Sequence, residues 1–248
     1  ALGAQLEDLG RIHTVREYLY CTSLLRGENF SADVMLGIRG QTKEDVKKTI
    51  EIAAGSGAKH ISMYALQPED GTPIYTDYLN GELPDGDEVA SLYDYGRELL
   101  AEKGFYRYEV SNFCKKGYES RHNLNYWKRG EYVGLGVAAS SFFSGRRLLN
   151  TTDLDEYMKC ILSGFYPVID NEEVSDRDAR FEFVMLGLRT VYGVNAGEYR
   201  KAFGSDWKQD FSAAYGRTRK YLQEEGDVTR IKDEYLFVQN QILSEYAN

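Results

Sequence analysis

The sequence predicts an α/β protein that ends in a small winged-helix-like α+β domain. The first observation is a strand–helix–strand pattern over residues 30–66, which has the length of a βαβ unit and implies a parallel strand pair. The second is a change of composition near Pro167, after which helical periodicity returns from Ser175. The third is a hairpin pattern over residues 228–238 that follows three helical segments, an order typical of a winged helix.

Helix and strand patterns alternate in the first part of the chain. Thr42 and Asp45 predict the capped start of the second helix, because a threonine hydroxyl and an acidic side chain three residues later satisfy the first free N–H groups. The predicted elements are, in order, the end of a strand at 1–5, a helix at 6–27, a strand at 30–37, a helix at 42–57, a strand at 59–66, a helix at 85–103 and a strand at 105–111.

Periodicity is weak between residues 112 and 165, where Gly, Asn and aromatic residues predict loops with a short strand. Helices are then expected over 177–191, 196–204 and 206–225, and the final hairpin is expected to turn near Lys232 and Asp233. The predicted domains are therefore 1–111, a connecting region at 112–171, and 172–248.

Composition and charge exclude several classes of protein. The net charge is −9, whereas nucleic-acid binders usually carry a basic face. Cys21, Cys114 and Cys160 are odd in number and far apart, which argues against a disulfide framework and predicts reduced thiols. The sequence has neither an apolar run long enough to span a membrane nor the features of a signal peptide, so we expect a cytoplasmic protein.

Five collinear segments resemble one known family. They are DVMLGIRGQTKEDV (33–46), HISMYALQPEDGTP (60–73), NGELPDGDEVASLYDYGRELLAEKGFYRYEVSNF (80–113), RHNLNYWKRGEYVGLG (121–136) and FEFVMLGLRTVYGVNAGEYRKAFG (181–204). The sequence resembles the radical S-adenosylmethionine (SAM) family of oxygen-independent coproporphyrinogen III oxidases, in its heme chaperone (HemW) branch. The resemblance implies a partial, half TIM-like radical SAM barrel before the C-terminal domain.

In that family a [4Fe-4S] cluster, held by C-x-x-x-C-x-x-C, lies with SAM at the mouth of the barrel. This sequence contains no such motif, and the resemblance begins at the fourth barrel strand. We therefore expect a fragment of a longer protein, with the cluster ligands outside this chain.

The resemblance assigns Gln5, Arg11 and Asp33 to SAM. An arginine can pair with the cofactor carboxylate, and an aspartate can accept hydrogen bonds from ribose hydroxyls. Gln5 and Arg11 lie closer together than in the family, which suggests a deletion between them. On the residues alone, a salt-bridged or solvated trio is the alternative interpretation.

The motif HNLNYW assigns His122, Asn123 and Tyr126 to heme, because the heme chaperone branch links this motif to heme binding. An imidazole is a normal axial ligand of heme iron, and Tyr126 is expected to flank the porphyrin. The alternative is a buried histidine whose ring is hydrogen-bonded and held by Asn123 and the neighbouring aromatic residues.

The sequence thus favours a heme chaperone that depends on SAM and a [4Fe-4S] cluster and passes heme to acceptor proteins, with peripheral contact where an acceptor lies in a membrane. An oxygen-independent coproporphyrinogen III oxidase and a degenerate, cluster-free binding module stay open as alternatives. The question of whether the protein is an enzyme also stays open at this point.

Overall fold

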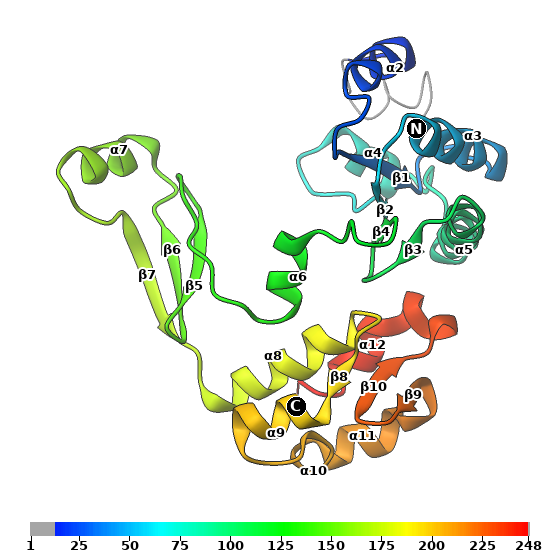
Figure 1. Ribbon diagram of the computed structural model, residues 1–248. Helices are drawn as coiled ribbons and strands as arrows, with labels where there is room; N and C mark the ends of the chain where they lie inside the picture. The colour runs from blue at the N-terminus through cyan, green and yellow to red at the C-terminus, as the bar shows by residue number, and fades with distance from the viewer. Residues whose placement is uncertain (1–12, 248) are drawn as a thin grey trace. The chain divides into compact units, whose positions relative to one another are not determined.

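The computed structural model describes residues 13–247, and the chain divides into two compact units, residues 1–120 and 121–248. The elements of the first unit are α2 (Val15–Leu24), β1 (Ser31–Leu36), α3 (Lys43–Gly55), β2 (His60–Ala65), α4 (Pro73–Leu79), α5 (Gly86–Glu102), β3 (Tyr106–Arg107) and β4 (Asn112–Cys114) (Figure 1). Of the segments predicted at 1–5 and 6–27, residues 1–12 lie outside the described residues.

A four-stranded sheet in the order β1-β2-β4-β3 organises the first unit. Strands β1 and β2 are parallel and joined through α3, which confirms the predicted βαβ unit. The single strand predicted at 105–111 is wrong: β3 and β4 form an antiparallel hairpin. The chain turns between them, because the Tyr108 N–H donates to the Asn112 carbonyl and the Ser111 N–H to the Glu109 carboxylate.

The capping box predicted at the start of α3 is confirmed. The Thr42 hydroxyl accepts a hydrogen bond from the Asp45 N–H at 3.2 Å, and the Asp45 carboxylate accepts one from the Thr42 N–H at 2.9 Å. Two N–H groups that the first helical turn cannot use are thereby satisfied.

The two faces of this sheet differ in chemistry. Alternate residues such as Val34, Ile61 and Phe113 are buried in a core that also contains residues of α3 and α5. Helix α5 approaches the sheet closely at Gly96, where an added Cβ would stand 2.6 Å from the Met63 sulfur. The opposite face carries the polar residues Asp33 and Ser62, which are in-register neighbours on β1 and β2.

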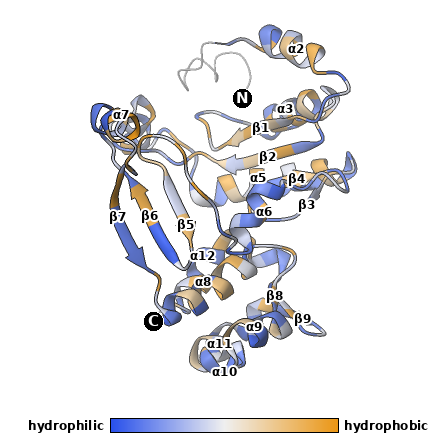
Figure 2. Cartoon of the chain, turned by 60° about the vertical axis from the view of Figure 1, so that its left-hand side comes forward, coloured by the Kyte–Doolittle hydropathy of each residue, from blue (hydrophilic) through white to orange (hydrophobic). Residues whose placement is uncertain are grey.

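The second unit contains two three-stranded sheets, β5-β6-β7 and β8-β10-β9. Its elements are α6 (Arg121–Trp127), β5 (Ser140–Phe143), β6 (Arg146–Asn150), α7 (Leu154–Leu162), β7 (Val168–Glu173), α8 (Asp176–Leu188), β8 (Val194–Asn195), α9 (Ala196–Phe203), α10 (Trp207–Asp210), α11 (Ser212–Thr218), η1 (Arg219–Tyr221), β9 (Leu222–Glu225), β10 (Val228–Ile231), η2 (Asp233–Val238) and α12 (Gln239–Ser244). Strand β7 is almost wholly exposed, and it changes from hydrophobic at Val168 and Ile169 to polar at its C-terminal end, which is blue in Figure 2.

The C-terminal hairpin lies earlier in the sequence than predicted. The strands are β9 and β10, and the turn falls at Gly226 and Asp227, so the prediction of a turn near Lys232 and Asp233 is wrong. Gly226 has a φ of 59°, a left-handed conformation that glycine adopts without steric cost. The helix predicted at 206–225 is also broken, into α10, α11 and η1, before β9 begins.

Helices α8 and α9 match the helices predicted from residue 177 and residue 196. Together with α10 to α12 they surround a core of large side chains that includes Val184, Leu188, Tyr199 and Trp207. No helix within residues 13–247 is both long and apolar enough to cross a membrane.

Candidate functional site

Helix α6 holds the HNLNYW motif and leaves the histidine accessible. His122 and Tyr126 are four residues apart and therefore share a face of the helix. Their rings meet edge to face with centroids 4.7 Å apart, and the rings of Tyr126 and Tyr132 do the same at 4.7 Å. No residue of α6 is buried, so this row of rings borders solvent.

The alternative interpretation of His122 as a buried, hydrogen-bonded core residue is wrong. His122 is exposed, and no hydrogen bond to its ring is formed within residues 13–247. Asn123 is half-buried and lies about 100° around the helix from His122. The imidazole nitrogens of His122 are therefore open to a ligand from outside the chain.

A cavity of about 500 Å³, here called the Tyr126 cavity, lies beside this row of rings. Its volume falls in the range of small-molecule pockets, about 300–1,000 Å³. Residues from α6, β5, β6, α8 and the connecting segment line it: Tyr126, Arg129, Gly130, Tyr132, Ser140, Phe142, Arg147, Glu182, Met185 and Leu186. The walls are thus largely aromatic and aliphatic, with three charged groups.

Those three charges form one network centred on Glu182, which is only 8% exposed. Arg129 Nε donates to one carboxylate oxygen of Glu182 at 2.6 Å, and Arg147 Nη2 donates to the other. The Arg129 guanidinium also lies over the Phe142 ring, 4.7 Å from its centroid. Burial lowers the pKa of Arg129, while the adjacent carboxylate favours its charged form.

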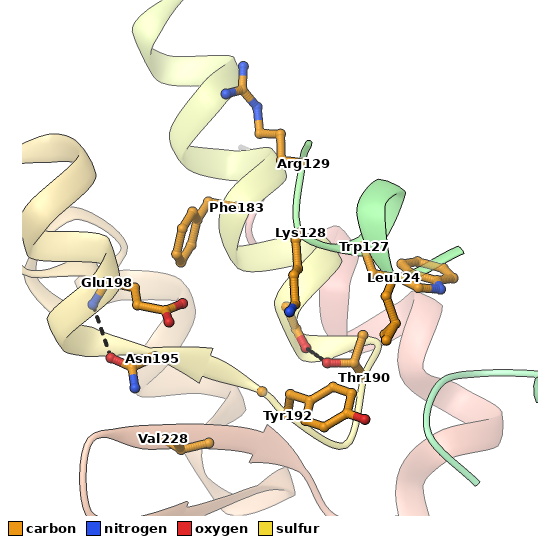
Figure 3. Close-up of a pocket in the computed structure, with 12 residues that line it drawn as sticks. Leu124, Trp127, Lys128, Arg129, Phe183, Thr190, Tyr192, Asn195, Glu198 and Val228 are labelled. Atoms are coloured by element: carbon orange, nitrogen blue, oxygen red, sulfur yellow. Dashed lines mark hydrogen bonds between the residues drawn. The ribbon is translucent and has the colours of Figure 1, made fainter. Parts of the chain in front are cut away.

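A second cavity, here called the Trp127 cavity, lies on the other side of α6 and has a volume of about 330 Å³. Leu124, Trp127 and Lys128 line it opposite Thr190 and Tyr192 (Figure 3). The Arg129 side chain points away from that group, toward Glu182. Helix α6 therefore contributes different residues to two separate cavities.

Of the residues predicted to contact SAM, Asp33 alone can be placed, because Gln5 and Arg11 lie outside the described residues. Asp33 is exposed on the polar face of the first unit's sheet. Close to it, the buried His60 ring is hydrogen-bonded to the Ser31 hydroxyl at 2.8 Å and to the Tyr108 hydroxyl at 2.7 Å. Burial lowers the pKa of His60, and the negative charge of Asp33 partly opposes that shift.

The described residues do not fit an iron–sulfur cluster. Cys21 is exposed, Cys114 is buried and Cys160 belongs to the other unit. Burial raises the pKa of Cys114 to about 11, which keeps its sulfur protonated at neutral pH. Between residues 13 and 247 no three His, Cys, Asp or Glu residues are grouped so that they could hold a metal ion.

Sequence reasoning missed the arginine–glutamate network. The sequence analysis gave Arg129, Arg147 and Glu182 no role in the site. The three residues come from elements up to 53 positions apart in the chain, so no local motif joins them. Only the folding of β6 and α8 around the end of α6 brings them together.

Comparison with known proteins gives concordant matches. The HemN C-terminal domain family matches residues 174–234. Heme chaperone HemW of Bacillus subtilis is 32% identical over 228 residues, which cover 89% of this chain and 59% of that protein. HemW of Lactococcus lactis is 35% identical over 219 residues, covering 86% and 56%. The bovine mitochondrial radical S-adenosyl methionine domain-containing protein 1 is 30% identical over 236 residues, covering 90% and 53%.

Among solved structures, coproporphyrinogen III oxidase (HemN) from Escherichia coli superimposes with a TM-score of 0.79 over 98% of this chain and 61% of that one. At 12% identity this likeness shows a shared α/β fold. The chain spans less than two thirds of the length of each of these proteins. Taken together, the matches show that this chain belongs to the radical SAM family of coproporphyrinogen III oxidases (HemN) and heme chaperones (HemW).

Proposed function

We propose that the protein to which this chain belongs is a heme chaperone of the HemW type, and that helix α6 binds the heme. The observation that carries the proposal is the exposed His122 ring, which has no hydrogen bond within residues 13–247 and stands beside an aromatic row and a cavity. A neutral imidazole nitrogen can ligate heme iron directly. The relatives named HemW support the same function.

The aromatic row supplies the second requirement of a heme site, which is apolar cover for the porphyrin. Tyr126 is 37% exposed, and its ring stands between those of His122 and Tyr132. A porphyrin ligated by His122 would bury part of this ring, at roughly 25 cal/mol for each Å² of apolar surface removed from water. Asn123, on an adjacent side of the helix, completes the proposed set.

For the first unit we propose a role in holding SAM. A half TIM-like barrel is consistent with the parallel β1–β2 pair, whose sheet buries one face against α3 and α5 and carries Asp33 on the other. Asp33 fits as an acceptor for ribose hydroxyls, with Gln5 and Arg11 completing the site. A bound [4Fe-4S] cluster would supply the electron that cleaves SAM, and its ligands belong outside residues 13–247.

The proposal also covers the domain boundaries, the binding partners and the cellular location. Residues 1–111 would form the barrel half, residues 112–171 the connecting region with the heme motif, and residues 172–248 a winged-helix-like domain. The partners are heme and heme-accepting proteins, reached in the cytoplasm or by peripheral contact with membrane acceptors. Binding of nucleic acid is not part of the proposal, because the chain has a net charge of −9.

Heme titration tests this function. His122→Ala should weaken heme binding about tenfold or more and shift the Soret band, because the iron loses an axial ligand. His13→Ala is the matched control, because His13 is exposed and lies outside the motif, and it should bind heme as the wild type does. Circular dichroism verifies that each variant is folded. Equal affinity in wild type and His122→Ala would remove α6 as the heme site.

A separate assay distinguishes the chaperone from the oxidase. If the gene encodes C-x-x-x-C-x-x-C before Ala1, the longer protein can be reconstituted without oxygen and given SAM and coproporphyrinogen III. Decarboxylation of the propionate groups would assign the oxidase. Transfer of bound heme to an acceptor without that reaction would support the chaperone.

A further inference from the structure

The charges of the Tyr126 cavity are unbalanced. Arg129 and Arg147 bring two positive charges and Glu182 one negative charge, so the cavity carries a surplus of one positive charge in a chain whose net charge is −9. Both oxygens of Glu182 are already used, one by each arginine. An anionic ligand would balance the remaining charge.

Of the two arginines, Arg147 has guanidinium N–H groups that are available to a ligand. Its side chain is 50% exposed and it donates to Glu182 through Nη2, while its other N–H groups bind no residue within 13–247. Arg129 differs, because its side chain is 21% exposed and stacked on Phe142. The planar fork of a guanidinium matches a carboxylate in two parallel hydrogen bonds. Arg147 therefore presents a carboxylate-binding group, and Glu182 fixes its position.

The walls of the cavity indicate what carries that carboxylate. Tyr126, Tyr132, Phe142, Met185 and Leu186 line the cavity with aromatic and aliphatic surface. A small inorganic anion would leave this surface unused, whereas an apolar ring system bearing a carboxylate would cover it. Tyr126 both lines the cavity and contacts the His122 ring, so a ring system that covers Tyr126 can reach from the cavity to the imidazole.

We propose that the Tyr126 cavity receives the propionate edge of the porphyrin, with a propionate carboxylate bound by Arg147. This inference rests on the proposed heme site at His122 and adds a determinant of ligand choice to it. Arg147 holds the propionate and Tyr126 packs against the ring, while Glu182 and Arg129 keep the guanidinium in place. The chain then selects porphyrins with free propionates over porphyrins in which they are esterified.

The test compares heme with heme dimethyl ester, which has no free carboxylate, on the full chain. Arg147→Gln should lower the affinity for heme about tenfold, the usual scale for losing a charge-assisted hydrogen bond. It should not change the affinity for the ester, and the Soret band of bound heme should stay in place because His122 still ligates the iron. Arg147→Lys keeps the charge without the fork and should give a smaller loss.

Arg146→Gln is the matched control, because Arg146 is the preceding residue on β6 and pairs with Asn171 and Glu173 instead of lining the cavity. It should leave heme affinity unchanged. Equal losses in Arg146→Gln and Arg147→Gln, or equal wild-type affinity for heme and its ester, would overturn the inference. If heme binding depends on His122 but not on Arg147, the heme site stands and the propionate contact falls. If wild type binds neither porphyrin, both proposals fall.

Discussion

At the scale of single residues, contacts between residues close in the sequence could be predicted, whereas contacts between residues far apart in the sequence could not. Thr42 and Asp45 form the predicted capping box, because a cap depends on residues three positions apart. His122 stays a predicted heme ligand, and its exposure was not predictable, since the same motif also fits a buried ring. The pairing of Arg129 and Arg147 with Glu182 needs the tertiary fold.

Gly193 provides a test at this scale. Its φ is 66°, and an added Cβ would stand 2.4 Å from the Thr229 carbonyl oxygen on β10. Gly204 has a similar φ of 74° with no atom within 4 Å of such a Cβ. Gly204→Ala should therefore cost about 1 kcal/mol for the left-handed backbone alone. Gly193→Ala should cost about 1–3 kcal/mol more, because the backbone of β10 must also move.

Urea denaturation of the two glycine variants gives both free energies of unfolding. The difference between the variants isolates the close approach of Gly193 to β10, since the conformational cost is common to both. Similar losses of unfolding free energy in the two variants would show that the close contact between Gly193 and β10 does not constrain the C-terminal unit.

At the scale of elements, the sequence predicts a strand or helix well where one hydrophobic pattern continues over the whole element. It predicts poorly where several short elements follow one another. The segments β1, α3 and β2 were predicted because each buries one face in the core. The helix expected at 206–225 failed because Trp207, Ala214 and Leu222 are all buried, although they belong to two helices and a strand. Buried residues in short consecutive elements imitate one continuous helical period.

The cap of α3 offers a prediction for an element. Thr42→Ala removes the hydroxyl that accepts from the Asp45 N–H and should lower the free energy of unfolding by about 1 kcal/mol. Thr42→Ser keeps a hydroxyl at the same position and should cost much less. Urea denaturation measures both variants, and helix content by circular dichroism reports the folded state. A serine variant as unstable as the alanine variant would exclude capping as the cause.

At the scale of the whole molecule, family membership supplies what local patterns do not. The comparisons show the family and the likeness to HemN shows the α/β fold, whereas the half-barrel and winged-helix assignments stay predictions. The reason is physical: a barrel is defined by the pairing of all its strands, and four strands of one sheet are described. The candidate SAM site also stays a prediction, because two of its three residues lie outside residues 13–247.

The stability of the whole chain should depend on pH through His60. Burial lowers the pKa of His60 in the folded state, while Asp33 opposes the shift and the hydroxyls of Ser31 and Tyr108 contact the ring. An unfolded histidine titrates near about 6.5, so as the pH falls through that value the unfolded chain takes up a proton before the folded chain does. The stability contributed by His60 is present above about pH 6.5 and is lost below it.

Unfolding curves at a series of pH values between about 5 and 8 measure this dependence. The wild type should lose more stability toward acid than His60→Gln, which has no titrating ring. His13→Gln serves as the control, because His13 is exposed, and should follow the wild type. Parallel curves for wild type and His60→Gln would contradict the assignment.

The network at Glu182 also limits how the sequence can drift and be recombined. Glu182 lies within the stretch that matches the HemN C-terminal domain, whereas Arg129 and Arg147 precede it. A replacement of Glu182 alone would leave two guanidinium groups facing each other with no acid between them. The three positions are therefore expected to change together during evolution. A chimera that takes only the C-terminal domain from a relative would receive the relative's residue at position 182. It would keep the network only if positions 129 and 147 were taken from the same relative.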